Sequence, residues 1–308
     1  MTLLYFTHPT AAAHDPGPGH PEAPIRMRAI EAAVAAADLP GLDRREAPEA
    51  APDQVRRAHP GSYVEDILAA VPASGYRRLD ADTAMSPASG EAALRAAGAA
   101  CAAVDAVVAG QAKAAFCAMR PPGHHAESDT PMGFCLFNNV AVGALQARHV
   151  HGLRKIAIFD FDVHHGNGTQ QIFWSDADTL YVSTHQSPLY PGTGHAHETG
   201  AHRNILNRPQ PPGTGSARWR QDVERHVLPA IDAWKPELVM ISAGFDAHRA
   251  DPLAQMELVE ADFAWVTREL RLLADRHAQG RVVSVLEGGY DPPALGRSVV
   301  AHLQSLGG

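Results

Sequence analysis

The residues of this 308-residue chain best suited to chemistry are acids and histidines that directly follow apolar runs. In KIAIFDFDVHHGNGTQ, residues 155–170, a run typical of a buried strand leads into Asp162 and His164, whose spacing can place both side chains on one side of an extended segment. Asp246 follows another such run, in ISAGFDAH. Two carboxylates and one imidazole, with positions left for water and substrate, suit an open Zn²⁺ or Fe²⁺ site. Any one of these aspartates could instead cap a helix or form an ion pair, but several charges on one edge favour a site.

A tandem histidine pair, His124 and His125 in RPPGHHA, follows a further apolar run. Imidazole has an ordinary pKa of about 6.5, so it can take a proton from water and return it to a leaving amine. Each ring needs an acceptor that orients its other nitrogen, and Asp160 and Asn167 are the natural candidates.

Tyr290 follows two glycines in LEGGYD. Because glycine has no side chain, Gly288 would let the backbone and the phenol approach a ligand closely. The phenol could then donate a hydrogen bond to a carbonyl oxygen as negative charge develops on it. A packing tyrosine with a solvated hydroxyl is the alternative.

Five apolar runs share one design, because each is rich in Val, Ile, Leu or Ala and turns polar or Gly-rich at its end. They begin AAFCAM, KIAIFD, TLYVST, PELVMI and RVVSVL. Helix-like segments with apolar residues at spacings of three and four lie between and before them, at 23–38, 89–111, 138–152, 218–235 and 257–280. Apolar strands that alternate with helices predict an α/β protein with a mostly parallel sheet covered by helices on both faces. Ligands bind such sheets beyond the carboxyl ends of the strands, where these runs turn polar.

The Pro- and Gly-rich segments 15–24 and 207–216 are predicted to be surface loops. Composition does not shift along the chain, so we expect one domain over residues 1–308. Three cysteines without CxxC spacing are expected to be reduced and mostly packed.

The formal net charge of −8 argues against a general nucleic-acid binder, since such proteins need basic faces to displace counterions. No apolar run reaches the roughly 18 residues of a membrane span. The first residues lack a basic segment before an apolar one, so a cytoplasmic protein without a membrane partner is expected. The sequence gives no indication of oligomeric state.

Six motifs resemble, in order, those of the zinc-dependent histone deacetylase superfamily: RPPGHHA, GFCLFNN, DFDVHHGNGTQ, STHQSPLYPGTG, SAGFDAHRADPL and LEGGY. The resemblance runs from GHPEAP, near residue 19, to Tyr290. It implies the arginase/deacetylase fold, with a central parallel sheet of about eight strands between helices. Asn167 resembles the class II and bacterial histone deacetylase-like amidohydrolase pattern, where many class I members have aspartate, and a neutral partner should leave His125 less basic.

The resemblance implies hydrolysis of acetyl-lysine or a related acetylated amine at one zinc ion. It assigns the ion to Asp162, His164 and Asp246. His125 would act as the base, Tyr290 would polarise the carbonyl, and His124, tied to Asp160, would chiefly tune the electric field and could share proton transfer. Potassium near Asp160, Asp162 and Ser183 is also implied for many members.

Gly133, Phe134 and Tyr190 resemble the walls of a tunnel that holds an aliphatic chain, although aromatic residues near Gly and Pro are commonly packing residues. Leu253 stands where some polyamine-selective relatives place an acid, which mildly disfavours the alternative of an acetylpolyamine amidohydrolase. Asp80 and Asp82 could compensate at the rim, or cap a turn.

Two rivals share the fold expectation. An arginase-like di-manganese enzyme needs carboxylates two residues after His164 and after Asp246, where this chain has Gly166 and His248. A catalytically silent acyl-amine binding module would be expected to lose a ligand or the tyrosine, and none is lost. Arg26 is expected either at the foot of the pocket, attracting acetate, or as a solvated helix residue.

Overall fold

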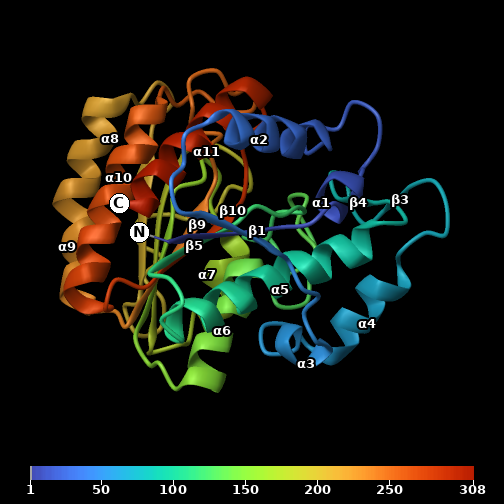
Figure 1. Cartoon of the computed structure of the whole chain (residues 1–308), viewed down its shortest axis with the longest axis horizontal. Helices are drawn as coiled ribbons and strands as arrows, with labels where there is room; N and C mark the ends of the chain where they lie inside the picture. Colours follow the sequence, from blue (N-terminus) through green and yellow to red (C-terminus); the bar gives the residue numbers. More distant parts are fainter. Residues whose placement is uncertain (1) are drawn as a thin grey trace.

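The core of the structure is one sheet whose eight strands are all parallel. A computed structural model describes residues 2–308, and in this range the sheet has the order β2-β1-β5-β10-β9-β6-β7-β8 (Figure 1). In chain order the strands are β1 Leu3–Thr7, β2 Leu42–Glu46, β5 Ala114–Cys117, β6 Ile156–Asp160, β7 Thr179–Gln186, β8 Ile205–Gln210, β9 Leu238–Ala243 and β10 Val282–Leu286. A separate antiparallel pair joins β3 Arg77–Arg78 to β4 Ala84–Met85.

Helices cover both faces of the sheet, as the alternation of strands and helices predicts. Figure 1 shows α2, α10 and α11 on one face and α5 and α6 on the other. The helices are α1 Thr10–Ala13, α2 Ile25–Ala36, α3 Pro52–Val55, α4 Gly61–Ala69, α5 Ser89–Val108, α6 Asn139–His151, α7 Asn167–Phe173, α8 Ser216–Asp222, α9 Leu228–Trp234, α10 Glu260–His277 and α11 Pro292–Gly307. None of the described helices is long and apolar enough to cross a membrane.

Local sequence accounts for the ends of the helices that lead away from the site. The Asn138 side chain accepts a hydrogen bond from the N–H of Ala141 and starts α6, and Gly152 ends the helix in the left-handed conformation. The Asp291 carboxylate caps α11 in the same way through the N–H of Ala294, and Pro292 supplies a fixed φ in the first turn. Both helices therefore begin at defined residues next to the site loops.

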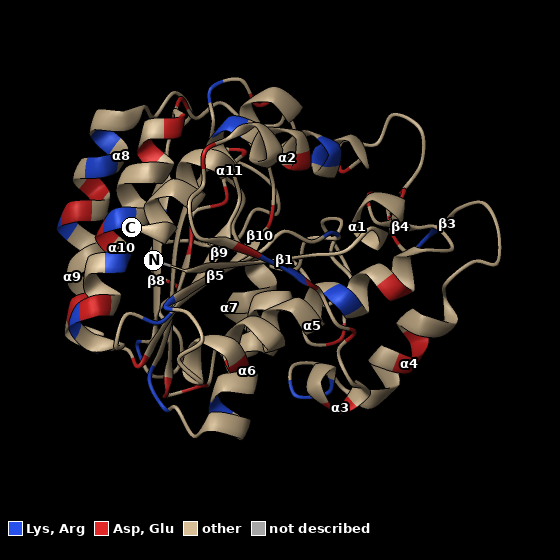
Figure 2. Cartoon of the chain, in the orientation of Figure 1, with Lys and Arg blue, Asp and Glu red and all other residues tan. Residues whose placement is uncertain are grey.

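The predicted helix over 218–235 is interrupted. It comprises α8, a π-helical turn over Val223–Val227, and α9. Pro229 lies in the first turn of α9 and has no N–H to give to the preceding turn, and its ring would clash with a carbonyl four residues earlier. The wider turn gives the ring room. The basic and acidic residues of these outer helices are interspersed (Figure 2), and Arg220 pairs with Asp262 across to α10.

Part of one loop prediction is wrong. Residues 207–210 belong to β8, and the loop begins only at residue 211. Because β8 is an edge strand, it has half-buried as well as buried residues and tolerates Pro209, whose missing N–H is not needed by a further strand. The segment 15–24 is a loop, but its Glu22 is fully buried instead of lying at the surface.

The three cysteines, Cys101, Cys117 and Cys135, are free and buried, as expected. In a parallel sheet all strands end at the same edge. The residues at and beyond the ends of β5, β6, β9 and β10 therefore come together, and they include every residue to which the sequence assigns catalysis or metal binding.

Candidate metal and catalytic site

Asp162, His164 and Asp246 lie together at the carboxyl edge of the sheet. One potential ligand atom from each lies within 4.8 Å of the others, and all three residues are buried. The Nδ1 atom of His164 is 3.2 Å from Oδ1 of Asp162 and 3.0 Å from Oδ2 of Asp246. The loops after β6 and β9 carry them, and these strands are neighbours in the sheet.

The turn after β6, and not an extended strand, brings Asp162 and His164 to the same side. The strand ends at Asp160, so the expected alternation along a continued strand is wrong. Asp160 accepts the N–H of Asp162 at 3.1 Å, and Asp162 accepts the N–H of His164 at 2.8 Å. Aspartate accepts from the backbone two residues on in this way in tight turns.

Backbone N–H groups and two glycines hold the carboxylates. Gly288 donates its N–H to Oδ2 of Asp162 at 2.8 Å, and Val163 donates to Oδ1 of Asp246 at 2.8 Å. A Cβ at Gly244 would overlap the Asp162 carboxylate, and a Cβ at Gly288 would overlap the carboxylates of Asp246 and Asp162. Gly288 thus lies behind the acids, not among the cavity-lining residues where substrate binding was expected.

The charges at this point favour a cation. Burial lowers the pKa of His164, but hydrogen bonds to Asp162 and Asp246 outweigh it and raise the pKa to about 10. Burial and then the charge of Asp162 raise the pKa of Asp246 to about 7. Burial also acts to raise the pKa of Asp162, but His124 and His164 hold it well below the ordinary value. Two buried carboxylates and an imidazole that together favour positive charge fit a divalent zinc or iron ion.

The histidine pair lies beside this cluster and makes both predicted contacts. His124 Nδ1 is 3.0 Å from Oδ2 of Asp160, and His125 Nδ1 is 2.8 Å from Oδ1 of Asn167. The Nε2 atom of His124 is 3.8 Å from Asp162, so His124 lies between two carboxylates. Burial lowers its pKa, but Asp162 and Asp160 outweigh burial, and the pKa stands well above the ordinary value.

Asn167 determines which nitrogen of His125 carries the proton. Its Nδ2 donates to Glu127 at 2.9 Å, so its Oδ1 is the atom that faces His125 and must accept from Nδ1–H. The Nε2 lone pair is then free, and His125 lines the cavity. Burial and the neighbouring His124 and His164 hold the pKa of His125 well below the ordinary value, so the ring is a neutral base.

A cavity of about 220 Å³ opens onto these groups. Its lining residues are Asp82, His125, Gly133, Phe134, His164, Leu189, Tyr190, Leu253 and Tyr290. Gly133 has φ of 56°, and a Cβ there would overlap the ring of His125. The ring of Phe134 meets the ring of Tyr290 edge-on, with centroids 5.8 Å apart, and the Tyr190 ring meets His125 in the same way at 5.2 Å. Aromatic and aliphatic walls thus lead to the His125 base.

The two acids considered for the rim have different places. Asp80 accepts the N–H groups of Asp82 and Thr83 and caps a turn. Asp82 lines the cavity, and its carboxylate accepts the N–H of Gly133 at 3.2 Å. Burial and Asp80 raise the pKa of Asp82.

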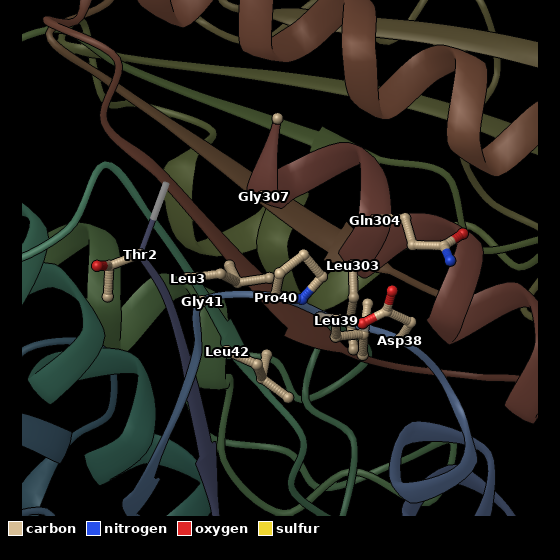
Figure 3. Close-up of a pocket in the computed structure, with 11 residues that line it drawn as sticks. Thr2, Leu3, Asp38, Leu39, Pro40, Gly41, Leu42, Leu303, Gln304 and Gly307 are labelled. Carbon is tan, nitrogen blue, oxygen red and sulfur yellow. The ribbon is translucent and has the colours of Figure 1, made fainter.

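A larger hollow at the opposite edge of the sheet does not offer comparable chemistry (Figure 3). It has a volume of about 450 Å³ and lies between the starts of β1 and β2 and the end of α11. Of the described side chains that line it, only that of Asp38 is an acid, and none is histidine or basic. A larger volume therefore does not by itself mark the functional site.

Sequence reasoning missed Glu287, which joins two parts of the site. Glu287 is fully buried, and its Oε2 accepts the N–H groups of Gly123, at 2.7 Å, and His124, at 3.1 Å. Its Oε1 accepts from Ser242 at 3.1 Å. Burial raises the pKa of Glu287 to about 7. The signal was present in VVSVLEGG, where an acid directly follows an apolar run, as Asp160 does.

Arg26 is buried at the foot of the site and is not a solvated helix residue. Its side chain is fully covered, and Nε donates to the carbonyl of Gly289 at 2.7 Å. The guanidinium carbon lies 4.9 Å from the centre of the Tyr290 ring. Glu22, itself buried, pairs with Arg26 and with Arg120. Burial acts to lower the pKa of Arg26. The negative charge of Glu22 outweighs burial, so the pKa of Arg26 is raised.

A parallel sheet between two helical layers, with acids and histidines gathered at its carboxyl edge, agrees with the arginase/deacetylase fold that the six motifs imply, and a match to a solved structure of the family shows this fold. The histone deacetylase domain model matches residues 20–306. The crystal structure of the HDA15 HD domain matches with a TM-score of 0.94 at 34% identity, covering 99% of this chain and 88% of that one.

Curated relatives agree with the structural match. The histone deacetylase-like amidohydrolase of Pseudomonas aeruginosa is 40% identical, over 98% of this chain and 80% of that protein. A probable deacetylase of Methanothermobacter thermautotrophicus is 41% identical, over 94% of this chain and 86% of its own. The chain belongs to the histone deacetylase family, an enzyme family that acts on amides, and the resemblance drawn from the six motifs is confirmed.

Proposed function

We propose that the chain is a zinc-dependent deacetylase that removes acetyl groups from acetyl-lysine or a related acetylated amine. One observation carries the proposal: the Asp162–His164–Asp246 cluster meets, at His164, a narrow cavity that His125 and Tyr290 also line. A base, a phenolic donor and a cation-binding cluster within one small cavity are what metal-assisted amide hydrolysis requires.

Each side chain can be given a task from its contacts. Zn²⁺, held by the two aspartates and His164, would supply polarisation of the acetyl carbonyl and a lower pKa for water. The free Nε2 of His125 accepts a proton from water and returns it to the departing amine, while Asn167 keeps the ring in the required tautomer. The Tyr290 phenol donates to the developing oxyanion. His124, between Asp160 and Asp162, keeps positive charge beside the reaction.

The walls of the cavity favour an aliphatic amine. Phe134, Tyr190 and Leu253 present apolar surface that suits the methylene chain of lysine. Leu253 offers no charge to a second ammonium group, which disfavours a polyamine. The Asp82 carboxylate on the same cavity is the observation that favours the second candidate, an acetylpolyamine amidohydrolase.

A turnover comparison tests the substrate. The zinc-loaded chain should hydrolyse acetyl-lysine peptides with a higher kcat/KM than acetylputrescine or acetylspermidine. Higher values for the two polyamines would select the second candidate. Bound zinc without turnover of any of the three would overturn both and leave the silent binding module.

We also propose a potassium ion near Asp160, Asp162 and Ser183. Asp160 in β6 and Ser183 in β7 are paired in the sheet and fully buried, and the backbone carbonyls around them are hard oxygen donors. The Ser183 hydroxyl already contacts His185 Nδ1 at 2.8 Å, so it would be shared. Elemental analysis after dialysis against sodium and against potassium buffers tests this; no retained potassium would contradict it.

A further inference from the structure

The segment that carries Tyr290 cannot position the phenol by itself. Two glycines precede it, and Gly289 has φ of 123°, a conformation that other residues rarely adopt. Glycine is the least restricted residue, so the backbone before Tyr290 has many accessible conformations. The position of the phenol must therefore be set by contacts from other segments.

Arg26 and Phe134 face the ring of Tyr290, and Asp251 holds its backbone. The Oδ2 atom of Asp251 accepts the backbone N–H of Tyr290 at 2.6 Å, and its Oδ1 accepts the N–H of Leu253 at 3.0 Å. Asp251 is only 7% exposed. Hydrogen bonds from N–H groups to a carboxylate are roughly twice as strong as bonds between neutral groups.

The two bonds of Asp251 join two segments of the cavity wall. Leu253 and Tyr290 both line the cavity but come from different segments, after β9 and after β10. The Asp251 N–H in turn donates to the carbonyl of His248, at 2.8 Å, two residues after Asp246. Asp251 thus connects the backbone of Tyr290 to the loop that carries a metal ligand.

We propose that Asp251 is a positioning residue that holds the Tyr290 phenol at its working distance from the Asp162–His164–Asp246 cluster. The inference rests on the proposed function of Tyr290 as oxyanion donor. Oxyanion donors act only within a narrow range of distance, and misplacement by about 1 Å can cost about 10²-fold in rate. Loss of the Asp251 carboxylate should therefore lower kcat much more than it raises KM.

A double-mutant cycle separates this role from a general structural one. Asp251→Ala should lower kcat for an acetyl-lysine peptide by about 10²-fold, with KM within about threefold and bound zinc unchanged. In the Tyr290→Phe background the same substitution should change kcat by less than about threefold, since the phenol through which it acts is gone. Equal losses in the two backgrounds, or wild-type kcat in Asp251→Ala, would overturn the proposal.

Conservative variants guard against simple misfolding. Asp251→Asn keeps one carbonyl acceptor for two N–H donors and should lose about tenfold in kcat. Asp291→Asn is the matched control, because it removes a carboxylate one residue from Tyr290 yet keeps the amide oxygen that caps α11. That control should stay within about twofold of wild type. A larger loss in Asp291→Asn than in Asp251→Asn would contradict the assignment.

Hydrogen exchange gives a measurement that does not depend on turnover. The Tyr290 amide should exchange at least about tenfold faster in Asp251→Ala and in Asp251→Asn than in wild type, and the Ala294 amide should not change. An unchanged rate at Tyr290 would overturn the positioning role whatever the activity. A wild-type chain that binds zinc but hydrolyses no acetylated amine would instead overturn the proposed function alone.

Discussion

Gly288 packs so closely against two of the predicted metal ligands that there is no room for a side chain at this position. Its N–H donates to Asp162, and a Cβ at this position would overlap the carboxylates of both Asp162 and Asp246. The sequence predicted that glycine was needed here for a close approach, but it assigned the approach to substrate. The structure shows that the approaching groups are the two acids.

Gly288→Ala should therefore weaken zinc binding by at least about 10-fold. The added methyl group would displace two carboxylates, and a metal ion requires its ligand atoms to lie within a few tenths of an ångström of their proper positions. Gly215→Ala is the control, since the nearest atom to its Cβ would lie at 3.9 Å and its φ of −99° is ordinary. Zinc affinity can be measured by competition with a chelator. Equal affinities for the two variants would contradict the account of Gly288.

Tyr290→Phe and Asp246→Ala should fail in different ways. The first removes one donor to the oxyanion and should lower kcat by about 10²- to 10³-fold with zinc retained. The second removes a ligand and should lose the metal and the activity together. Metal content and kcat measured on the same samples check both. Unchanged turnover in Tyr290→Phe would remove the phenol from the mechanism.

The residue types in the sequence predicted the chemistry of the site better than they predicted the residues that hold the site in place. Asp162, His164, Asp246 and the histidine pair stand out because ionisable groups rarely follow buried strands without a partner. Asp251 and Glu287 act through backbone N–H groups of distant segments. The apolar run before Glu287 marks this acid as a candidate, but nothing in the local sequence states which backbone either acid meets, so only the three-dimensional arrangement could reveal their contacts.

At the level of elements, the loops after β5 and β10 are held together by Glu287. Its carboxylate receives two N–H groups from the loop that carries His124 and His125, while Tyr290 follows three residues later. The relative position of the bases and the phenol thus depends on one buried side chain.

Glu287→Leu should destabilise the fold by on the order of 2–4 kcal/mol, because it leaves buried N–H groups of Gly123 and His124 without an acceptor. Glu287→Gln keeps an oxygen for those groups and an amide that can donate to the Ser242 hydroxyl, so it should retain most of the stability. Urea unfolding of both variants measures the difference. Equal losses in the two would show that the lost charge, not the missing acceptor, matters.

Of the eight strands in the main sheet, five were predicted; β1, the buried apolar run LLYFT, could have been, and the two edge strands could not. The runs that became β5, β6, β7, β9 and β10 are covered on both faces and read as continuous apolar sequence. In contrast, β2 and β8 are the edge strands, and LDRRE of β2 has half-buried and exposed residues only. An edge strand forms mainly because it pairs with the neighbouring strand, so the β-propensity of its own residues does not reveal it.

For the molecule as a whole, buried histidines should couple stability to pH. Burial lowers the pKa of His59 and His185 to about 4 and that of His302 to about 3. His302 bridges three elements, with Nδ1 2.6 Å from Thr267 in α10 and Nε2 2.8 Å from Ser284 in β10. The unfolded chain regains the ordinary pKa of about 6.5 for each ring.

Between pH 6.5 and about 4 these histidines therefore bind more protons in the unfolded chain than in the folded chain, and their contribution to the free energy of unfolding falls as the pH is lowered. Each such histidine contributes about 1.4 kcal/mol per pH unit in that range and nothing above it. His302→Gln should make the slope shallower by up to one proton, measured by urea unfolding of the metal-free chain at several pH values. Identical slopes for variant and wild type would contradict this.

The central claim is that amide hydrolysis depends on one zinc ion held by Asp162, His164 and Asp246. The most direct measurement is titration of the chelator-treated chain with Zn²⁺ while acetyl-lysine peptide turnover is followed. Activity should rise in proportion to added zinc and stop rising at one ion per chain. Turnover that survives complete metal removal, or that stays absent when one zinc ion is bound, would contradict the account.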